Sequence, residues 1–312
     1  MLIRRILVPL DGTEFAEAAL GPARVIAERA RAALELVTVR ARDGVIVSGA
    51  PMADPALARE KERTLRHYLD DVLRRERGRS TTPANASLLE GDVSDALVAA
   101  IAEQDVDLVV MATHARGGLK RLWLGSTAED LIRSAHVPLL LVPRPQAGDE
   151  AAAEHEGFHR VVVGLAGNDA DDRVLDATFA VTDRAQATYT LLHVATFTLV
   201  PPAVLGAPSP PDELAALPPA LDQAEVEQAQ RYLEGIAAPL HAHGVAVDAQ
   251  VETGRTVADA IVDHATRMSA DLIALATRAP GAIERAALGS VADKVMRKAR
   301  TAVLICPPLR EG

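Results

Sequence analysis

The sequence predicts a tandem α/β protein, in which two copies of one doubly wound domain follow each other along the chain. The main observation is an internal repeat: residues 107–145 return without a gap as residues 271–309, with Ala-Thr and Leu-Gly-Ser at matching places. A second match links residues 3–13 (IRRILVPLDGT) to residues 158–168 (FHRVVVGLAGN). Strand-like and helix-like segments alternate strictly in both copies, which favours right-handed crossovers and a parallel sheet covered by helices on both faces.

A chain of 312 residues suits two domains of ordinary size. We place domain 1 at residues 1–146, a linker of small and polar residues at 147–157, and domain 2 at 158–312. Residues 201–219 are rich in proline, so we expect an irregular insertion there in domain 2, between the second strand and the long helix.

Each copy opens with a short β-branched run that is apolar at consecutive positions, as expected for a strand buried on both faces. Helical spacing of apolar residues marks the segments between the strands. The elements predicted in the first copy are strands at 6–8, 34–39, 86–90, 108–111 and 139–142, with helices at 14–32 and 55–77, around 93–98, and from Ser126. Those predicted in the second copy are strands at 161–163, 189–194, 245–252, 272–275 and 302–305, with helices at 171–185 and 220–243, around 256–262, and from Ser290.

Composition excludes several classes of function. A net charge of −10 argues against non-specific binding to duplex DNA or to an anionic membrane, both of which need a basic surface. No apolar run approaches the roughly 20 residues of a membrane span. The single cysteine, Cys306, lies in an apolar run and is expected to be a buried, unreactive side chain. We therefore expect a cytoplasmic protein that binds neither nucleic acid nor membrane.

The candidate site lies where ligands bind in open parallel sheets, beyond the carboxyl ends of the strands. Small residues there let a ligand approach the backbone, and a helix N-terminus favours anions. Asp11 can accept hydrogen bonds from ribose hydroxyls or a base amine. In domain 1 these features suggest a mononucleotide pocket formed by Asp11, Ala112, Ala115, Arg116, Gly125, Ser126 and Thr127.

Structural interpretations of the same residues remain open. Ser126 and Ser290 are suited to capping their helices, and Asp11 can equally cap the helix that begins near Glu14. Arg116 can belong to a solvated loop face. The sequence contains no Walker A, dinucleotide-binding, nucleophile-elbow or HExxH motif, so no assembled catalytic site is predicted.

The segments VPLDGTEFAEAAL, MATHARGGLKRLWLGSTAEDLI and PLLLVPR resemble those of the universal stress protein family. The resemblance covers both halves, as in tandem members of the family. It implies a five-stranded sheet in the order 3-2-1-4-5 and frequent dimerisation through the last strand. One branch of the family binds ATP through G-x-x-G-x9-G-[S/T], whereas another lacks this motif and does not bind ATP.

Both copies depart from that motif. Its first two glycines are replaced by Ala112 and Ala115 in one copy and by Ala276 and Ala279 in the other. Its last two positions are kept, as Gly125-Ser126 and Gly289-Ser290. Asp11 aligns with Ala166, Arg116 with Pro280 and Lys120 with Glu284, so domain 1 is expected to be the better nucleotide site.

The resemblance thus implies a stress-response protein that binds ATP or a related adenine nucleotide mainly in domain 1, with Mg²⁺ as a candidate companion ion. Pro9, Val39 and Met111 would line the base. No residue is suited to activate water, so at most slow ATP hydrolysis is expected. The alternative is a nucleotide-free module in which the two fifth strands pair with each other. In that interpretation the apolar surfaces recruit a second copy, giving a homodimer, or another protein partner.

Overall fold

The computed structural model describes residues 1–41, 55–113, 125–143, 157–196, 223–254, 256–277 and 289–308. The predicted linker, apart from Gly157, and the proline-rich insertion at 201–219 lie outside these residues. In the described part of the chain, no helix is both long enough and apolar enough to cross a membrane.

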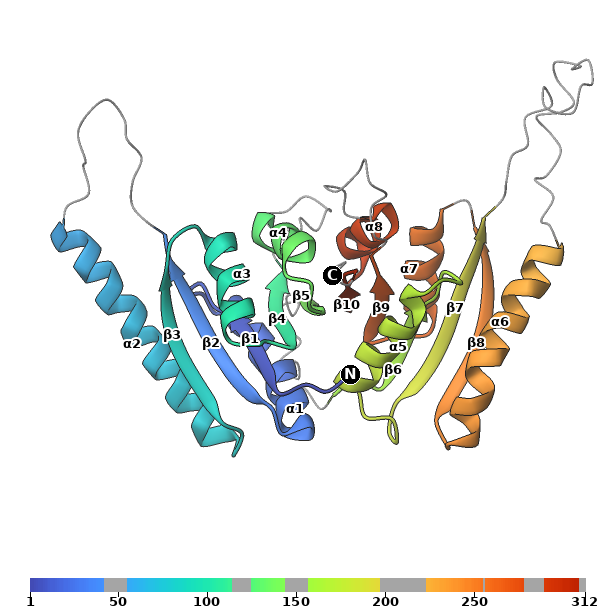
Figure 1. The fold of residues 1–312 in the computed structure, drawn as a ribbon, viewed down its shortest axis with the longest axis horizontal. Helices are drawn as coiled ribbons and strands as arrows, with labels where there is room; N and C mark the ends of the chain where they lie inside the picture. Colours follow the sequence, from blue (N-terminus) through green and yellow to red (C-terminus); the bar gives the residue numbers. More distant parts are fainter. Residues whose placement is uncertain are drawn as a thin grey trace, which may run out of the picture.

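Ten strands form a single sheet in the order β3-β2-β1-β4-β5-β10-β9-β6-β7-β8 (Figure 1). Each half contributes five parallel strands in the order 3-2-1-4-5, which confirms the predicted topology. The elements of the N-terminal half are β1 (Arg5–Pro9), the 3₁₀ helix η1 (Ala16–Ala19), α1 (Leu20–Ala30), β2 (Ala33–Arg40), α2 (Pro55–Arg79), β3 (Ala84–Glu90), α3 (Val93–Glu103), β4 (Leu108–Thr113), α4 (Ser126–Ser134) and β5 (Leu139–Pro143). Those of the C-terminal half are β6 (Arg160–Gly164), α5 (Ala170–Val181), β7 (Thr188–Thr196), α6 (Gln223–Ala242), β8 (Ala246–Gly254), α7 (Val257–Arg267), β9 (Leu272–Ala276), α8 (Ser290–Lys298) and β10 (Ala302–Cys306).

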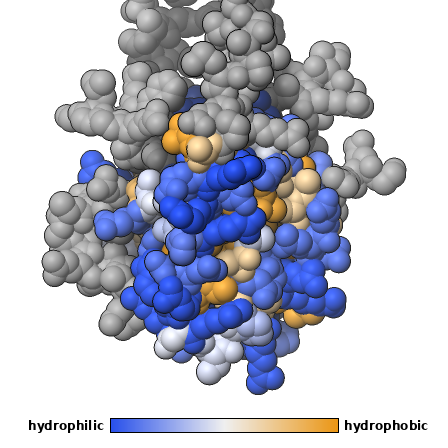
Figure 2. Space-filling view, turned by 90° about the vertical axis from the view of Figure 1, so that its left-hand side faces the viewer, coloured by the Kyte–Doolittle hydropathy of each residue, from blue (hydrophilic) through white to orange (hydrophobic). Residues whose placement is uncertain are grey.

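Helices cover both faces of the sheet, which explains why the strands are apolar at consecutive positions. Side chains of α1, α2, α5 and α6 share one hydrophobic cluster with one face of the sheet. Side chains of α3, α4, α7 and α8 share a second cluster with the opposite face. The outward face of α2 is largely hydrophilic and carries ion pairs between residues of successive turns, such as Arg66 with Glu62 (Figure 2).

The two halves join through their fifth strands. β5 and β10 pair antiparallel, with Leu304 opposite Leu140. On one side of this seam Arg29 of α1 donates to the carbonyl of Ala180 in α5 over 2.5 Å. On the other side Arg297 of α8 bonds Glu129 of α4 over 2.8 Å. The resemblance implied pairing of last strands between separate chains, and the alternative interpretation placed it between the two halves of one chain, as the structure shows.

The helix after the first strand differs from the prediction in both halves. A single helix at 14–32 was expected, but a 3₁₀ helix precedes α1, which ends where Arg31 adopts a left-handed conformation (φ 56°). In the second half, the helix predicted to reach residue 185 ends at Val181. The hydroxyl of Thr182 bonds that of Tyr189 (2.6 Å), and the carboxylate of Asp183 accepts from the amide of Ala185 (2.9 Å). These side chains stabilise a turn in place of further helix.

Glu76 is a buried charge that connects α2 to α1. Its carboxylate, only 2% exposed, lies 3.2 Å from the guanidinium of Arg24. The side chain of Arg24 is itself only 13% exposed. Because Glu76→Ala would leave this nearly buried charge without its partner, we expect a loss of about 3 kcal/mol of unfolding free energy. Urea denaturation followed by circular dichroism measures the loss. A variant with an unchanged midpoint would show that solvent replaces the pair.

Cys306 is buried at the end of β10, as predicted. Burial raises the pKa of its thiol to about 12, so the nucleophilic thiolate is scarce at neutral pH. We expect the native protein to resist a thiol reagent at pH 8 and to react fully once it is unfolded in guanidinium. Fast labelling of the native protein would contradict this assignment.

Candidate functional site

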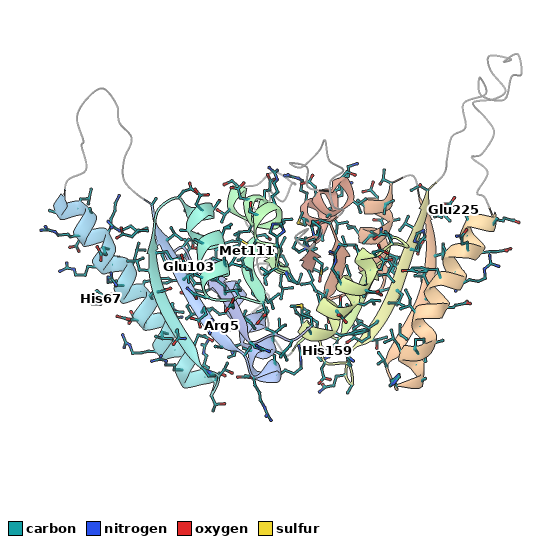
Figure 3. All side chains as sticks on the ribbon, in the orientation of Figure 1. Arg5, His67, Glu103, Met111, His159 and Glu225 are labelled. Carbon is teal, nitrogen blue, oxygen red and sulfur yellow. The ribbon has the colours of Figure 1, made fainter. Side chains whose placement is uncertain are left out.

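A cavity of about 230 Å³ lies at the carboxyl ends of β1, β2 and β4 in the N-terminal half. Figure 3 labels Met111, which marks this end of β4 beside α4. The described residues that line the cavity are Pro9, Leu10, Asp11, Phe15, Ala16, Val37, Thr38, Val39, Leu65, Val93, Leu97, Met111, Ala112, Thr113, Gly125, Thr127 and Ala128.

Sheet topology places the cavity here. β1 pairs with β2 on one side and β4 on the other, so the chain leaves β1 in one direction and later returns to its other edge. The helices that follow β1 and β4 pack on opposite faces of the sheet, so a crevice remains between the two strand ends, as at the switch point of any doubly wound sheet. Pro9 lies beside Val37, and Ala112 lies beside Val142.

The structure brings together most of the site residues predicted in the N-terminal half. Those that line the cavity are Pro9, Asp11, Val39, Met111, Ala112, Gly125 and Thr127. Ser126 is exposed at the first turn of α4 and is not one of the lining residues. Ala115 and Arg116 lie outside the described residues.

The loop after β1 is shaped by hydrogen bonds of its own side chains. The Oδ1 atom of Asp11 accepts from the amide of Thr13 (3.0 Å) and from its hydroxyl (2.5 Å). The same hydroxyl accepts from the amide of Ala16 (3.2 Å), so Thr13 rather than Asp11 bonds the first helical turn. Gly12 has a left-handed φ of +84°, which glycine adopts without strain. Asp11 is thereby held at the rim of the cavity with its carboxylate exposed.

The start of α4 corrects an expectation about Ser126. Gly125, not Ser126, occupies the N-cap position, in an extended conformation (φ −65°, ψ 151°) and without a side-chain cap bond. Gly289 holds the same position at α8, again without one, so Ser290 is not a cap either. No side chain of the cap residue satisfies the first amides of α4, and the positive end of the helix dipole faces the cavity rim.

Several lining residues were not predicted as site residues. Phe15 and Leu65 come from the loop after β1 and from α2, and Val93 and Leu97 from α3. Their apolar spacing indicated only which helix face is buried. Thr38 is 2% exposed, and its hydroxyl has no hydrogen-bond partner in the described part of the chain. A threonine at a strand end gives no signal in the sequence that could have identified it.

The chemistry of the lining is simple. Asp11 is its one ionisable side chain among the described residues. Groups of three or more metal-ligating side chains are likewise absent from the described ranges. The cavity can therefore enclose an apolar ring, accept hydrogen bonds at Asp11 and offer backbone amides at α4.

At the equivalent position in the C-terminal half, side chains of the protein lie directly over the strand end. Gly164 takes the place of Pro9, and a Cβ atom there would lie 2.4 Å from Cδ2 of Leu275 and 3.6 Å from Cδ1 of Ile261. Of the residues predicted for this half, Ala276 ends β9, and Gly289 and Ser290 begin α8. Ala279 lies outside the described residues.

Comparison with known proteins gives the same match for both halves. The sequence model of the universal stress protein family matches residues 2–143 and 157–307. A universal stress protein of Methanocaldococcus jannaschii is 39% identical over 62 residues, which are 20% of this chain and 36% of that protein, so the match spans about a third of that relative. One from Thermus aquaticus is 30% identical over 143 residues, 45% of this chain and 99% of its own. A crystal structure of a universal stress protein from Archaeoglobus fulgidus has the same fold, with a TM-score of 0.68, 18% identity, and coverage of 97% of this chain and 98% of the other.

Proposed function

Because the chain belongs to the universal stress protein family in both of its halves, we propose that it is a regulatory stress-response protein that binds an adenine nucleotide, ATP above all, in its N-terminal domain. The observation that carries the proposal is the cavity at the ends of β1, β2 and β4, with Asp11 at one rim and the N-terminus of α4 at the other. The first of these groups suits a nucleoside, and the second suits phosphate.

Each part of the ligand has a matching part of the site. Pro9, Val39 and Met111 would enclose the base, and Asp11 would accept from the ribose hydroxyls. The cavity volume of about 230 Å³ is smaller than the roughly 300–1,000 Å³ of pockets for whole drug-sized ligands. The nucleoside would therefore be enclosed, while the phosphates would extend along the first turn of α4 past Gly125, Ser126 and Thr127.

Alanine in place of the first motif glycine is compatible with this site. Ala112 and Ala276 are both absent from the residues with a positive φ, so a methyl group strains neither backbone. A methyl is also the smallest side chain that could face a phosphate. Alanine in place of this glycine therefore reduces the space for a phosphate by one methyl group but does not block the site.

The site is suited to binding rather than to turnover. Mg²⁺ would be held chiefly by the phosphate oxygens and water and would neutralise part of their charge. Asp11, the one carboxylate of the described lining, bonds Thr13 and is assigned to the ribose rather than to water at the phosphates, so we propose at most slow hydrolysis. Binding of the nucleotide, rather than its hydrolysis, would then act as the signal.

We also propose that the protein is cytoplasmic, and cell fractionation under stress would test this location.

Mass spectrometry of small molecules released on denaturation tests the proposal directly. We expect an adenine nucleotide in the extract, or saturable binding of Mg-ATP by calorimetry once the protein has been stripped. Protein that releases no nucleotide and gives no heat with millimolar Mg-ATP would contradict the proposal.

That negative result would favour a second candidate, a nucleotide-free interaction module. The observation behind this candidate is the seam, where β5 and β10 already pair two domains within one chain. In this candidate the protein recruits a second copy or another protein through surfaces away from the seam. Size-exclusion chromatography with light scattering would detect a homodimer.

A further inference from the structure

A buried carboxylate occupies the loop after β6, the counterpart of the loop after β1. Asp171 is 2% exposed, and its oxygens accept from the backbone amides of Ala166 (3.0 Å), Gly167 (2.7 Å) and Asn168 (3.4 Å). The hydroxyl of Tyr232 in α6 donates a further bond over 2.8 Å. Four donors from two elements thus converge on one side chain.

Consecutive amides that point at one anion form the kind of nest in which proteins bind anionic ligands. In this loop the anion is part of the protein. The left-handed glycine of the loop recurs in both halves, with φ +75° at Gly167 and +84° at Gly12. The two loops share this backbone feature. In the C-terminal domain the amides of the loop donate to Asp171, a side chain of the protein itself.

The N-terminal domain lacks that carboxylate. Ala16 aligns with Asp171, and its small side chain lines the cavity. Tyr68 aligns with Tyr232, but its buried hydroxyl lies beside the carboxylate of Glu17, and Tyr68 is not one of the residues that line the cavity. Burial, reinforced by the nearby carboxylates of Glu17 and Asp11, raises the pKa of Tyr68, so it remains a neutral donor. Of the matching loop amides, that of Thr13 already bonds Asp11, whereas those of Asp11 and Gly12 have no hydrogen-bond partner among the described residues. The place of the carboxylate, beside Ala16, is therefore open to a ligand.

Two further contacts distinguish the domains in the same way. His193 Nδ1 lies 3.0 Å from the carbonyl oxygen of Leu165 and ties β7 to the loop after β6. Thr38 stands at the matching place in the N-terminal domain, and its buried hydroxyl has no partner in the described ranges. Leu275 fills the space over Gly164, whereas Pro9 borders the cavity.

We propose that the side chain at the position of Ala16 and Asp171 decides which domain accepts a ligand. Asp171 is a built-in occupant that closes the C-terminal site, and Ala16 leaves the N-terminal site open, so the chain binds one adenine nucleotide. This inference rests on the proposed function and adds the stoichiometry and the residue that sets it.

Calorimetry of the full chain with Mg-ATP tests the proposal, with Ala16→Asp and Ala16→Asn as variants. Wild-type protein is expected to bind one equivalent. Both substitutions place a polar side chain in the cavity beside the loop after β1, so both should weaken binding at least tenfold while thermal melting stays cooperative. Asn adds no charge, so its effect reports occupancy rather than repulsion from Asp11. Ala18→Asp, at a half-buried position outside the cavity lining, is the control and should bind like wild type.

The outcomes separate the two proposals. No binding by wild-type protein would overturn the proposed function. Two equivalents per wild-type chain, or one equivalent with full affinity in folded Ala16→Asn protein, would overturn the assignment of Asp171 and Ala16 alone. Photolabelling of wild-type protein with 8-azido-ATP, followed by peptide mapping, needs no variant. Labels confined to the N-terminal half would support the inference, and labels in the C-terminal half would refute it.

Discussion

Aspartate in place of Leu304 is expected to remove most of the folding free energy of this protein. Leu304 is fully buried in β10, opposite Leu140 of β5 and beside Ala274 of β9. Truncating a buried leucine to alanine already costs about 2–5 kcal/mol, and an unpaired buried carboxylate adds several more. The sum is comparable with the roughly 5–15 kcal/mol that stabilises an ordinary domain. Because both halves contribute to the seam, both should be affected.

Guanidinium denaturation followed by circular dichroism measures this effect. Leu57→Asp is the matched control, because Leu57 is 54% exposed on α2 and the same substitution there should change stability by less than about 0.5 kcal/mol. If Leu304→Asp unfolded at the wild-type midpoint, the seam would contribute little to stability, and the two domains would be independent units on one chain.

Most of the architecture could be predicted because each strand and helix is encoded twice, once in each copy of the repeat. Consecutive apolar residues at Ile6 to Val8 and at Val161 to Val163 indicated strands buried on both faces, and the two runs lie within β1 and β6, respectively. Predicted element ends differ where side chains compete with the backbone. The turn held by Asp183 is an example, because nothing in the local spacing distinguishes its aspartate from one that continues a helix.

The candidate site was only partly predictable, for a physical reason. Residues at the ends of β1 and β4 could be identified, since the topology places these two strands side by side. Phe15, Thr38 and Leu65 line the cavity because α2 and the first helical turn pack near β2, which depends on tertiary contacts. The role of Asp171 likewise depends on Tyr232, which is distant in sequence and adjacent in space. Alignment of the two copies shows that Ala16 corresponds to Asp171, but it does not show which groups the aspartate contacts.

Replacing Gly125 by aspartate is expected to abolish nucleotide binding without harming the fold. Gly125 has an extended conformation that any residue can adopt, and a Cβ atom added there meets no atom within 4 Å. Aspartate is also preferred over glycine at an N-cap by a few tenths of a kcal/mol. A carboxylate at this rim would face the phosphates, and like charges a few ångströms apart near a protein surface repel by about 2 kcal/mol or more. The affinity for Mg-ATP should therefore fall at least about thirtyfold.

Two variants show whether charge at this rim is the cause. Gly125→Asn adds a side chain of the same size and capping ability without the charge, so it should bind much more tightly than Gly125→Asp. Gly289→Asp places the same carboxylate at the N-cap of α8, in the domain whose site is filled by Leu275 and Asp171. It should leave affinity unchanged and raise the melting temperature as much as the substitution at α4. Equal losses for Gly125→Asp and Gly289→Asp would mean that both domains hold phosphate, whereas no loss for either would place the phosphates away from both helix N-termini.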